Sequence, residues 1–581
     1  MRITVNGTPV EVNHIPGDNL YELLTKSGYR INAPCGGGGR CGKCRVTIEN
    51  PDEPTEEDAR LLDEATLEMG IRLACATVVS EGMSVGFELQ NEKLAHIVTE
   101  GKSIKYAFNP AVREYRVKLS PPELSSQSAD FERVKATIGM GNLIIGRRLL
   151  KELPFVLRAN GWEIDVVTYG DRLLGFNPHG LYGVAVDIGT TTLATYLMDL
   201  RTGAELAVAS SLNPQKPYGD DVISRSDYAR SGGLDVLQQI VAAEINRLVV
   251  ELCAQANINS RDIYLMTLAG NTVMMHLFAG VSPENIALSP FIPAWTGSMD
   301  FCAAELGLEL NPEAVATVLP CVAGYVGADT VAAMLAVGMR EDGDITLLID
   351  IGTNGEIALS ASGRLFACST AAGPAFEGAH ISSGMGGVSG AINKAKVDSQ
   401  VRYSTIGNTQ AKGICGSGLL DLISGFLENG AIDDTGRIDP DSAPDWLQIS
   451  DSGLPVDSDK GIFITKRDIR EVQLAKGAIA AGVEVLINEA GIKVSDIQHV
   501  YLAGGFGSFM DKRSACRVGL IPMELLNRTS AIGNGSGAGA KAALLSCDAM
   551  REAERLSHVV RYVELSARKD FQDAFMDKMM F

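Results

Sequence analysis

The sequence predicts a multidomain chain built of α+β and α/β units, and three observations carry that prediction. At 581 residues the chain is longer than one hydrophobic core supports, since domains average about 150 residues. Four of its 11 cysteines fall within the first 75 residues. A strand that ends in Asp and is followed by Gly-Thr occurs twice, 163 residues apart, which indicates two related half-domains.

The overall composition excludes several classes of protein. A hydrophobic share of 46% and a charged share of 21% are those of a globular chain. The net charge is −20, so we expect no nucleic-acid partner, because phosphate binding needs clustered basic residues. No apolar run reaches the roughly 18 residues of a membrane span, and the N-terminus has no secretory pattern. We therefore expect a cytoplasmic protein without a membrane partner.

Residues 1–90 are expected to form a compact α+β domain. Alternating apolar residues flank Asn6-Gly7, a pair that favours the tight turn of a β-hairpin. A short helix should follow around residues 20–24, with Asp18 as its cap and Gly28 as its stop. Further elements are predicted at residues 45–49 (strand), 56–65 (helix) and 83–89 (strand). So small a domain has a modest core, which a bound cluster would stabilise.

The early cysteines have the spacing of a metal-ligand set, C-x5-C-x2-C and a fourth cysteine 30 residues later: Cys35, Cys41, Cys44 and Cys75. Thiolates are soft ligands, and four of them suit an iron–sulfur cluster or zinc. Three ligands from one tight loop and one from a distant segment favour [2Fe–2S], because a zinc ribbon normally has two CxxC pairs. The glycines of this loop let the backbone wrap around a cluster, although a flexible linker with unrelated cysteines is the plain alternative.

With these cysteines, residues 1–90 resemble the [2Fe–2S] ferredoxins of the β-grasp fold. The gap of five residues between Cys35 and Cys41 is one longer than in plant-type ferredoxins and is nearer to the adrenodoxin-like spacing. The resemblance implies a [2Fe–2S] cofactor held by the four cysteines. The longer gap leaves the reduction potential of that cluster undefined.

The next two segments are a linker and a small middle domain. Residues 91–111 have no clear period and are interpreted as the linker, and residues 112–180 as an α+β domain. A helix at 142–153 should end at Pro154, because proline lacks an N–H and clashes with the preceding turn. The other predicted elements are a strand at 115–119, a short helix from Pro154 to about Ala159, and a hairpin of 163–169 and 173–176.

Residues 181–581 have the alternation of strands and helices of an α/β domain, with long helices at 234–254 and 468–490. Two buried strands end in Asp187 and Asp350, and each is followed by glycine and hydroxyl residues. Glycine lets a backbone approach a phosphate, hydroxyl and N–H groups donate to its oxygens, and a carboxylate suits Mg²⁺. A third strand leads into Gly504-Gly505, where a flat base or ribose can lie against bare backbone.

Taken in order, these motifs resemble the phosphate-1, phosphate-2 and adenosine motifs of the acetate and sugar kinase, Hsp70 and actin superfamily. The resemblance covers residues 181–581 and implies a two-lobed ATPase domain that binds ATP and Mg²⁺, with Asp187 and Asp350 as catalytic carboxylates. The implied nucleotide-binding residues are Gly189, Thr190, Thr191, Gly352, Thr353, Asn354, Gly416, Gly504 and Gly505. Each Gly-Thr motif alone is also compatible with an ordinary turn between strands.

Four other residues have two interpretations each. Gly416 lies in a Gly-rich run before a helix, which either places a helix N-terminus near phosphate or allows close helix packing. His276 is interpreted as a hydrogen-bonded structural residue rather than a ligand. Asp329 and Glu377 lie in Gly-rich loops, where they either orient water or are plain loop carboxylates.

A ferredoxin domain joined to a two-lobed ATP-binding domain indicates that ATP is coupled to an unfavourable electron transfer. We call this ATP-binding domain the ATP clamp. The whole chain resembles the reductive activators of corrinoid-dependent methyltransferases, also in Ser120-Pro121-Pro122, in residues 186–192, and in Asn213-Pro214-Gln215 followed by residues 218–221. The resemblance implies one-electron reduction of a Co(II) corrinoid to Co(I) with ATP hydrolysis. It also implies a corrinoid protein as partner, an upstream low-potential electron donor and a homodimer.

Two other functions fit the same domains. One is an ATP-dependent activator of another low-potential or radical enzyme, and the other is a non-enzymatic redox-sensing module that binds ATP. Only Cys516 and Cys547 lie in the last 100 residues, without a CxxC pair, which argues against [4Fe–4S] ligands there. The linker and the middle domain separate the ferredoxin domain from the ATP clamp along the chain. We therefore expect coupling through lobe closure rather than through direct contact alone.

Overall fold

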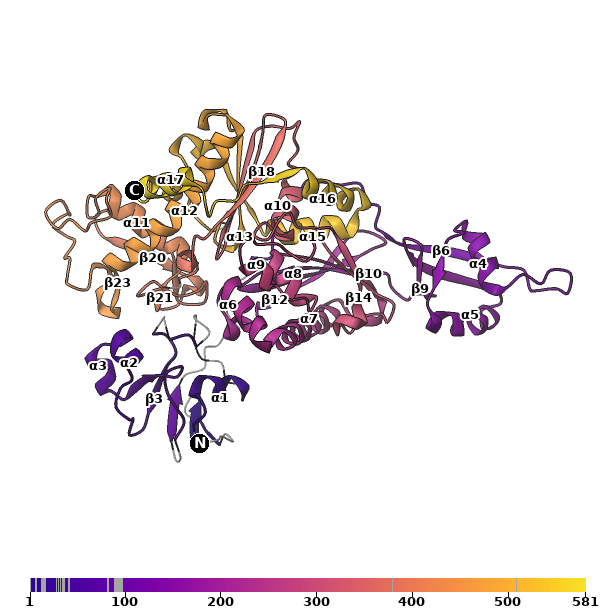
Figure 1. Cartoon of the computed structure of the whole chain (residues 1–581), viewed down its shortest axis with the longest axis horizontal. Coiled ribbons are helices and arrows are strands. Elements are labelled where there is room, and N and C mark those ends of the chain that lie inside the picture. The colour runs from indigo at the N-terminus through magenta and orange to yellow at the C-terminus, as the bar shows by residue number, and fades with distance from the viewer. Residues whose placement is uncertain are drawn as a thin grey trace.

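The computed structural model describes the chain except residues 1, 6–7, 12–16, 28, 30, 32, 34–36, 40–41, 81–82, 88–97, 379 and 508, and the side chains of 2–5 and 8–11. A two-lobed body forms the centre of the molecule (Figure 1). The N-terminal domain lies beneath this body, and the domain of residues 112–180 projects from the far end of one lobe. Among the described residues, no helix is both long and apolar enough to cross a membrane.

The N-terminal domain is a five-stranded sheet with three short helices. Its strand order is β2-β1-β5-β3-β4. The strands are β1 (Arg2–Val5), β2 (Thr8–Glu11), β3 (Arg45–Ile48), β4 (Ile71–Leu73) and β5 (Ser84–Phe87), and the helices are α1 (Leu20–Lys26), α2 (Glu56–Leu61) and α3 (Glu64–Glu68). Strands β1 and β2 pair antiparallel with Val5 opposite Thr8, which confirms the predicted hairpin, although its Asn6-Gly7 turn lies outside the described residues.

Two local predictions in this domain are wrong. Asn19, rather than Asp18, caps α1, because its side chain accepts from the Glu22 N–H. The predicted helix 56–65 is two helices, since Asp63 accepts from the Thr66 N–H and starts α3 as a new cap. The predicted stop of α1 at Gly28 lies outside the described residues.

Residues 98–111 run along the two-lobed body rather than crossing open space. The Lys102 N–H donates to the Ile532 carbonyl, the Ile104 N–H to Ala336 and the Asn109 N–H to Leu545. The Tyr106 hydroxyl donates to the Leu335 carbonyl. This part of the segment 91–111 is therefore docked, because its backbone groups find partners on the body. Residues 91–97 lie outside the described part of the chain.

The domain of residues 112–180 packs two helices on a four-stranded sheet of order β6-β8-β9-β7. The elements are β6 (Val112–Lys118), α4 (Asp130–Ile138), β7 (Ile144–Ile145), α5 (Arg147–Ala159), β8 (Glu163–Tyr169) and β9 (Arg172–Phe176). The β8–β9 hairpin was predicted, and α4 was not. Helix α5 runs through Pro154, contrary to the predicted stop, because Leu149, Leu153 and Leu157 bury one continuous stripe against the sheet.

The first lobe of the central body is built on a six-stranded sheet of order β12-β11-β10-β13-β15-β14. Its strands are β10 (Tyr182–Ile188), β11 (Thr192–Asp199), β12 (Glu205–Leu212), β13 (Ile263–Gly270), β14 (Met299–Cys302) and β15 (Val315–Val318). Its helices are α6 (Val222–Tyr228), α7 (Leu234–Ala256), α8 (Thr272–Phe278), α9 (Glu284–Ala287) and α10 (Ala328–Val337).

The second lobe repeats this plan with a sheet of order β25-β24-β16-β17-β18-β26. Its strands are β16 (Thr346–Ile351), β17 (Gly355–Ala361), β18 (Arg364–Thr370), β24 (His499–Ala503), β25 (Thr529–Gly533) and β26 (Val560–Tyr562). Smaller sheets contain β19 (Ala391–Val397), β20 (Val401–Thr405), β21 (Gly413–Ile414), β22 (Leu454–Asp457) and β23 (Ile462–Ile464). The helices are α11 (Gly416–Glu428), α12 (Lys466–Ala490), α13 (Gly504–Gly507), α14 (Lys512–Arg517), α15 (Gly535–Leu545), α16 (Cys547–Val559) and α17 (Lys569–Lys578).

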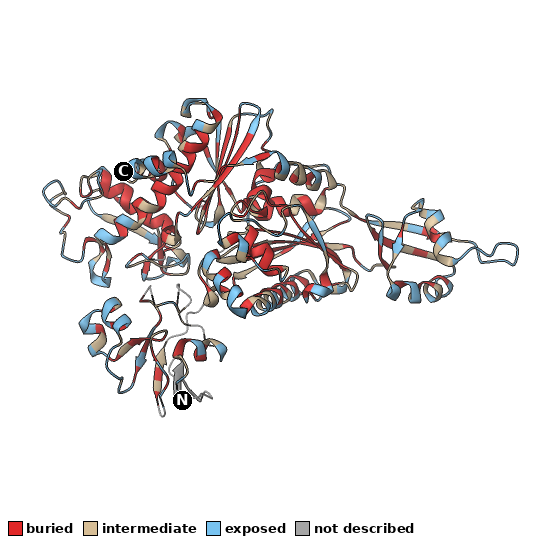
Figure 2. Cartoon of the chain, in the orientation of Figure 1, coloured by how far each residue is buried: buried red, intermediate tan, exposed pale blue. Residues whose placement is uncertain are grey.

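The internal repeat predicted from the sequence is confirmed by the strand pairing. In each lobe the strand that ends in Asp pairs antiparallel with the next strand and parallel with a later one: β10 with β11 and β13, and β16 with β17 and β24. Buried residues fill both sheets and the helices that cover them (Figure 2). The Gly-rich α15 packs closely on α10, because a Cβ built at Gly539 would lie only 2.0 Å from the Ala332 carbonyl oxygen. The C-terminal region therefore also completes the core of the first lobe.

Candidate functional site

The two predicted phosphate loops meet at one carboxylate. The Thr191 hydroxyl donates to Oε2 of Glu377 and the Thr353 hydroxyl to Oε1, each at 3.0 Å. Thr191 precedes β11 of the first lobe, whereas Thr353 lies between β16 and β17 of the second. Glu377 was open between two interpretations from the sequence, and the structure makes it the residue that joins the loops.

Each loop closes a tight turn on its predicted glycine, and the turn of the first loop is one residue longer than that of the second. The Gly189 N–H donates to the Thr192 carbonyl at 2.9 Å, and the Gly352 N–H donates to the Asn354 carbonyl at 3.0 Å. A Cβ built at Gly189 would lie 2.9 Å from the Thr192 carbonyl oxygen, which is closer than a side chain tolerates. The turn therefore requires glycine in the first loop, and the backbone is left bare for close approach.

A buried set of polar residues supports the first loop from behind. Arg225 donates to the Thr190 carbonyl at 2.5 Å, and Asn213 donates to the Gly189 carbonyl at 2.8 Å. Asn271, the cap of α8, donates to the Thr190 hydroxyl at 3.0 Å. The Arg225 side chain is fully buried, and burial lowers its pKa to about 10. Sequence reasoning gave Arg225 and Asn271 no role, since no local spacing indicates these long-range contacts.

Asp187, the first predicted catalytic carboxylate, is held by two donors from α15 and its cap. Ser536 donates to Oδ1 at 2.7 Å, and the Asn534 amide donates to Oδ2 at 2.8 Å. Burial raises the pKa of Asp187, and these two hydrogen bonds oppose that effect. The Asn534 N–H also donates to the Glu100 carbonyl, so the docked segment 98–111 begins beside this carboxylate.

Three more buried carboxyl groups interact electrostatically in this region: Asp329 of the first lobe, and Asp350 and Glu356 of the second. Burial raises the pKa of Asp350 to about 7, with further contributions from the charges of Asp329 and Asp187. Burial, opposed by a hydrogen bond from the Thr330 N–H, raises the pKa of Asp329 to about 6. Burial also raises the pKa of Glu356 well above its usual range. Within the described residues, no group of three or more His, Cys, Asp or Glu side chains could hold a metal ion by itself. Carboxylate oxygens such as those of Asp187 and Asp350 are ligands of the type that Mg²⁺ takes while keeping several waters.

The predicted adenosine motif lies against the second phosphate loop. Gly504 has φ +86°, and a Cβ there would lie 2.5 Å from Oδ1 of Asp350, so close approach requires glycine. A Cβ at Gly505 would meet no heavy atom within 4 Å among the described residues. The next residue, Phe506, stacks on Phe376 with ring centroids 4.8 Å apart. Gly505 thus leaves open space beside a flat aromatic stack, which suits a planar group.

Gly416 and His276 have structural roles. A Cβ at Gly416 would lie 1.8 Å from the Phe376 carbonyl oxygen, so this glycine allows close packing of α11. Its assignment to nucleotide binding stays a prediction. His276 is buried between the Thr272 carbonyl and the Ala294 N–H and stacks on Trp295, which confirms the structural interpretation.

Two of the four predicted cluster ligands lie side by side. The Sγ atoms of Cys44 and Cys75 are 3.3 Å apart, and Cys44 is buried. Cys35 and Cys41 lie outside the described residues. Gly37, Gly39 and Gly42 in the same loop all have φ between +66° and +86°, a region that favours glycine. One sulfur after a tightly turned loop and an adjacent one from a distant segment fit thiolate ligation of a cluster.

The N-terminal domain touches both lobes beside their phosphate loops. The Tyr21 hydroxyl donates to the Pro217 carbonyl of the first lobe at 2.5 Å. Lys43, next to Cys44, donates to the Ile381 carbonyl of the second lobe at 3.4 Å. The domain of residues 112–180 therefore separates the ferredoxin domain from the lobes along the chain but not in space, since it lies at the opposite end of the body (Figure 1). Coupling through lobe closure stays a prediction.

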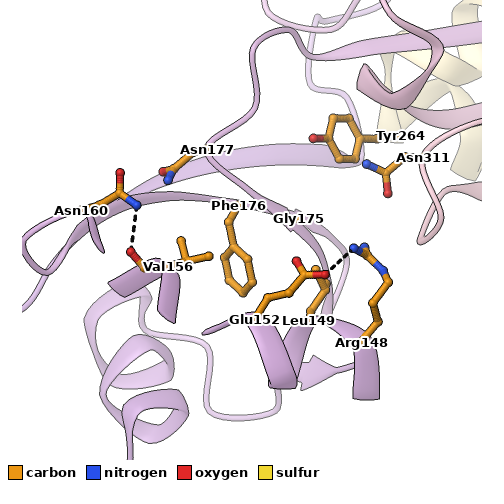
Figure 3. Close-up of a pocket in the computed structure, with 10 residues that line it drawn as sticks. All are labelled: Arg148, Leu149, Glu152, Val156, Asn160, Gly175, Phe176, Asn177, Tyr264 and Asn311. Carbon is orange, nitrogen blue, oxygen red and sulfur yellow. Dashed lines mark hydrogen bonds and ion pairs between the residues drawn. The ribbon is translucent and has the colours of Figure 1, made fainter. Parts of the chain in front are cut away.

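A separate polar cavity of about 230 Å³ lies between the domain of residues 112–180 and the first lobe. Arg148 and Glu152 of α5 form an ion pair at its edge, and Tyr264 and Asn311 of the first lobe close the other side (Figure 3). None of the predicted cluster or nucleotide residues lines this cavity.

The fold and the site together define an ASKHA-type ATPase joined to a ferredoxin-type iron–sulfur domain. Four family descriptions match: the 2Fe-2S iron-sulfur cluster binding domain at residues 3–80, the RACo linker region at 101–180, the RACo middle region at 182–342 and the C-terminal ASKHA domain of RACo at 344–581. The chain belongs to the RACo family. In that division the linker region includes the domain of residues 112–180, and the middle region is the first lobe.

One curated relative and one solved structure match over almost the whole chain, and a second curated relative matches over 59% of it. Corrinoid activation enzyme RamQ of Eubacterium limosum is 32% identical, over 97% of this chain and 96% of its own. The [Co(II) methylated amine-specific corrinoid protein] reductase of Methanosarcina barkeri is 28% identical, over 59% of this chain and 66% of its own. The solved structure of a reductive activator for a corrinoid, iron-sulfur protein has 32% identity and a TM-score of 0.74, covering 100% of this chain and 98% of that one.

Proposed function

We propose that this protein is an ATP-dependent reductive activator that transfers one electron from a [2Fe–2S] cluster to a corrinoid protein, Co(II) to Co(I). The observation that carries the proposal is the juxtaposition in one chain of paired cluster cysteines and two phosphate loops that meet at Glu377. The names of relatives that match over nearly the full length point to the corrinoid partner.

The chain's own residues divide the work between two sites. Cys35, Cys41, Cys44 and Cys75 would hold the cluster, which supplies one-electron transfer. Thr190, Thr191, Thr353 and Asn354 present hydroxyl, amide and N–H donors to phosphate oxygens, with Gly189 and Gly352 leaving the backbone accessible. Asp187 and Asp350 would orient the waters of Mg²⁺, which neutralises phosphate charge. Gly504 and Gly505 would accommodate the adenosine, and Gly416 would place the N-terminus of α11 nearby.

The remaining assignments are also proposals. An upstream low-potential protein delivers electrons to the cluster. The protein works as a homodimer, for which the exposed Ile144 and Phe155 of the domain of residues 112–180 offer apolar surface. It works in the cytoplasm, where thiols stay reduced, in agreement with the seven free cysteines from Cys253 to Cys547.

The test is an anaerobic assay of a Co(II) corrinoid protein with a low-potential reductant, followed by the absorbance change of Co(II) to Co(I). Reduction should require both ATP and the cluster. The variant Cys44→Ala should abolish it, whereas Cys302→Ala, which removes a free thiol from β14 of the first lobe, should not. A redox-sensing module would give no ATP-stimulated reduction of any acceptor, and that outcome would overturn the proposal.

A further inference from the structure

In the described part of the chain, hydrogen bonds join the ferredoxin domain to both lobes of the body. Pro217, which accepts from Tyr21, lies in sequence between Asn213 and Arg225, two of the residues that support the first phosphate loop. Ile381, which accepts from Lys43, lies four residues after Glu377. Figure 1 shows the ferredoxin domain below both lobes. Helix α1 lies near α6, and the opposite side of the domain lies near β21.

The two attachment points belong to one rigid unit on the ferredoxin side. Tyr21 and Cys44 lie in the same buried core, at 5% and 0% exposure, so Tyr21 and the neighbouring Lys43 keep a fixed separation. On the body, Pro217 and Ile381 belong to different lobes. Any rotation of one lobe against the other changes their separation, and the rigid domain can then satisfy only one of the two contacts.

Glu377 holds the lobe arrangement in which both contacts are made. Its carboxylate accepts from Thr191 of the first lobe and from Thr353 of the second. Each hydroxyl has a single proton to donate, so the same hydroxyls cannot donate to a phosphate and to Glu377 at once. Phosphate at these loops therefore competes with the side chain that bridges the lobes.

We propose that the ferredoxin domain docks across the nucleotide cleft in the arrangement held by Glu377, and that a nucleoside triphosphate at the two loops releases it. The inference rests on the nucleotide-binding half of the proposed function and needs no corrinoid partner. Coupling between two binding events is reciprocal, so docking weakens nucleotide binding by the same factor by which nucleotide weakens docking. Release also uncovers the loop that contains Lys43 and Cys44.

Reciprocity gives a direct test on the full chain with its cluster. Tyr21→Phe removes the hydrogen bond to Pro217, and Lys43→Ala removes the one to Ile381. Each should tighten binding of a non-hydrolysable ATP analogue by about two- to tenfold, the worth of one hydrogen bond, in titration calorimetry. The matched controls are Tyr29→Phe, whose ring packs on Phe87, and Lys26→Ala, which pairs with Glu22 within α1; both should bind the analogue as the wild type does.

Hydrogen–deuterium exchange supplies a second readout. Saturation with the analogue should speed exchange in α1 and in residues 213–228, while the core strand β10 stays protected. Unchanged affinity in Tyr21→Phe and Lys43→Ala, or unchanged or slower exchange at saturation, overturns the release mechanism. Absence of any analogue binding to the wild type overturns the nucleotide assignment instead, so the two failures are distinguishable. Cluster absorbance and the thermal midpoint confirm that each variant is folded.

Discussion

Thr191 and Thr353 stand on different lobes, yet their hydroxyls donate to the two oxygens of the Glu377 carboxylate, each at 3.0 Å. Both hydroxyls lie in the loop that follows the strand ending in Asp in their lobe. They are not at equivalent positions of the internal repeat, because Thr191 is four residues after Asp187, whereas Thr353 is three residues after Asp350. The Glu377 carboxylate therefore links the two lobes through one hydrogen bond to each. This makes Glu377 the side chain whose removal should have the most informative effect.

We expect Glu377→Ala to bind an ATP analogue more tightly and to hydrolyse ATP more slowly. Binding should tighten about threefold or more because both hydroxyls are released for phosphate. Turnover should fall about tenfold to a hundredfold because the loops lose their common anchor and reacting groups are misplaced. Calorimetry and phosphate release measure the two effects separately. Glu471→Gln, which changes a neighbour of His380 in the same region, is the control. Equal loss of affinity and turnover would contradict this role.

The parts of the site that the sequence predicted are those encoded by short spacings. The C-x5-C-x2-C run and the two strand–Asp–Gly-Thr motifs are local, so they identify the loops that contain Cys44, Asp187 and Asp350 without a fold. Glu377 was singled out in the sequence, but neither of its two interpretations was a bridge between the lobes, because Thr191 lies far away in sequence. Arg225 was missed, since a buried arginine leaves no periodic signal. The predicted end of a helix at Pro154 was wrong for a related reason, since burial of the leucine stripe of α5 outweighs the local cost of proline.

The carboxylate assignment predicts that Asp187→Asn and Asp350→Asn each strongly reduce ATP turnover without unfolding the protein. Each carboxylate serves the cation more than the core, and the amide keeps its shape. We expect a decrease of about a hundredfold or more, as for other groups that stabilise transferring phosphate. Phosphate release measures it, and circular dichroism reports folding. Asp342→Asn, an exposed partner of Arg340, should leave turnover unchanged. Normal ATP hydrolysis by both Asp187→Asn and Asp350→Asn would contradict the assignment of these two carboxylates to the nucleotide site.

The raised pKa of Asp350, about 7, predicts a specific pH dependence in protein without nucleotide or divalent cation. The folded state binds this proton more tightly than the unfolded chain, whose Asp titrates near 4. Stability is therefore fully present below about pH 4 and falls as the pH rises through 7. Asp350→Asn should flatten this fall, gaining on the order of 1 kcal/mol over the wild type between pH 5 and pH 8. Chemical denaturation at both values measures it, and an equal slope in the two proteins would refute the effect.

The cluster assignment predicts iron and acid-labile sulfide in the 2:2 ratio of a [2Fe–2S] centre in protein purified without oxygen. Cys41→Ala should lose the cluster and all corrinoid reduction but should still bind nucleotide, since the phosphate loops lie in the two lobes and not in the ferredoxin domain. Metal analysis and calorimetry measure the two. Cys547→Ala, a free thiol at the start of α16, is the matched control. Metal analysis that finds four irons per chain, or zinc, would contradict the assignment of a [2Fe–2S] cluster.

The last prediction concerns how nucleotide controls the corrinoid partner. A ligand shifts an equilibrium only by its differential affinity for the two states, so ATP and ADP should differ in their effect on partner binding. Tyr21 and Lys43 hold the ferredoxin domain against both lobes, and the uncovered surface is available only after release. We therefore expect affinity for the Co(II) corrinoid partner to be highest with a non-hydrolysable ATP analogue and lower with ADP or no nucleotide.

The double variant Tyr21→Phe and Lys43→Ala separates release from nucleotide binding itself. If the partner binds the surface that the ferredoxin domain uncovers, this variant without nucleotide should approach the partner affinity of the wild type with the analogue. The control pair, Tyr29→Phe and Lys26→Ala, should still require the analogue, because neither side chain contacts a lobe through a described hydrogen bond. Surface binding measurements with the Co(II) partner distinguish the two. Equal affinities under all three nucleotide conditions, with reduction still dependent on ATP, would exclude this coupling and leave a direct effect of hydrolysis on the cluster as the explanation.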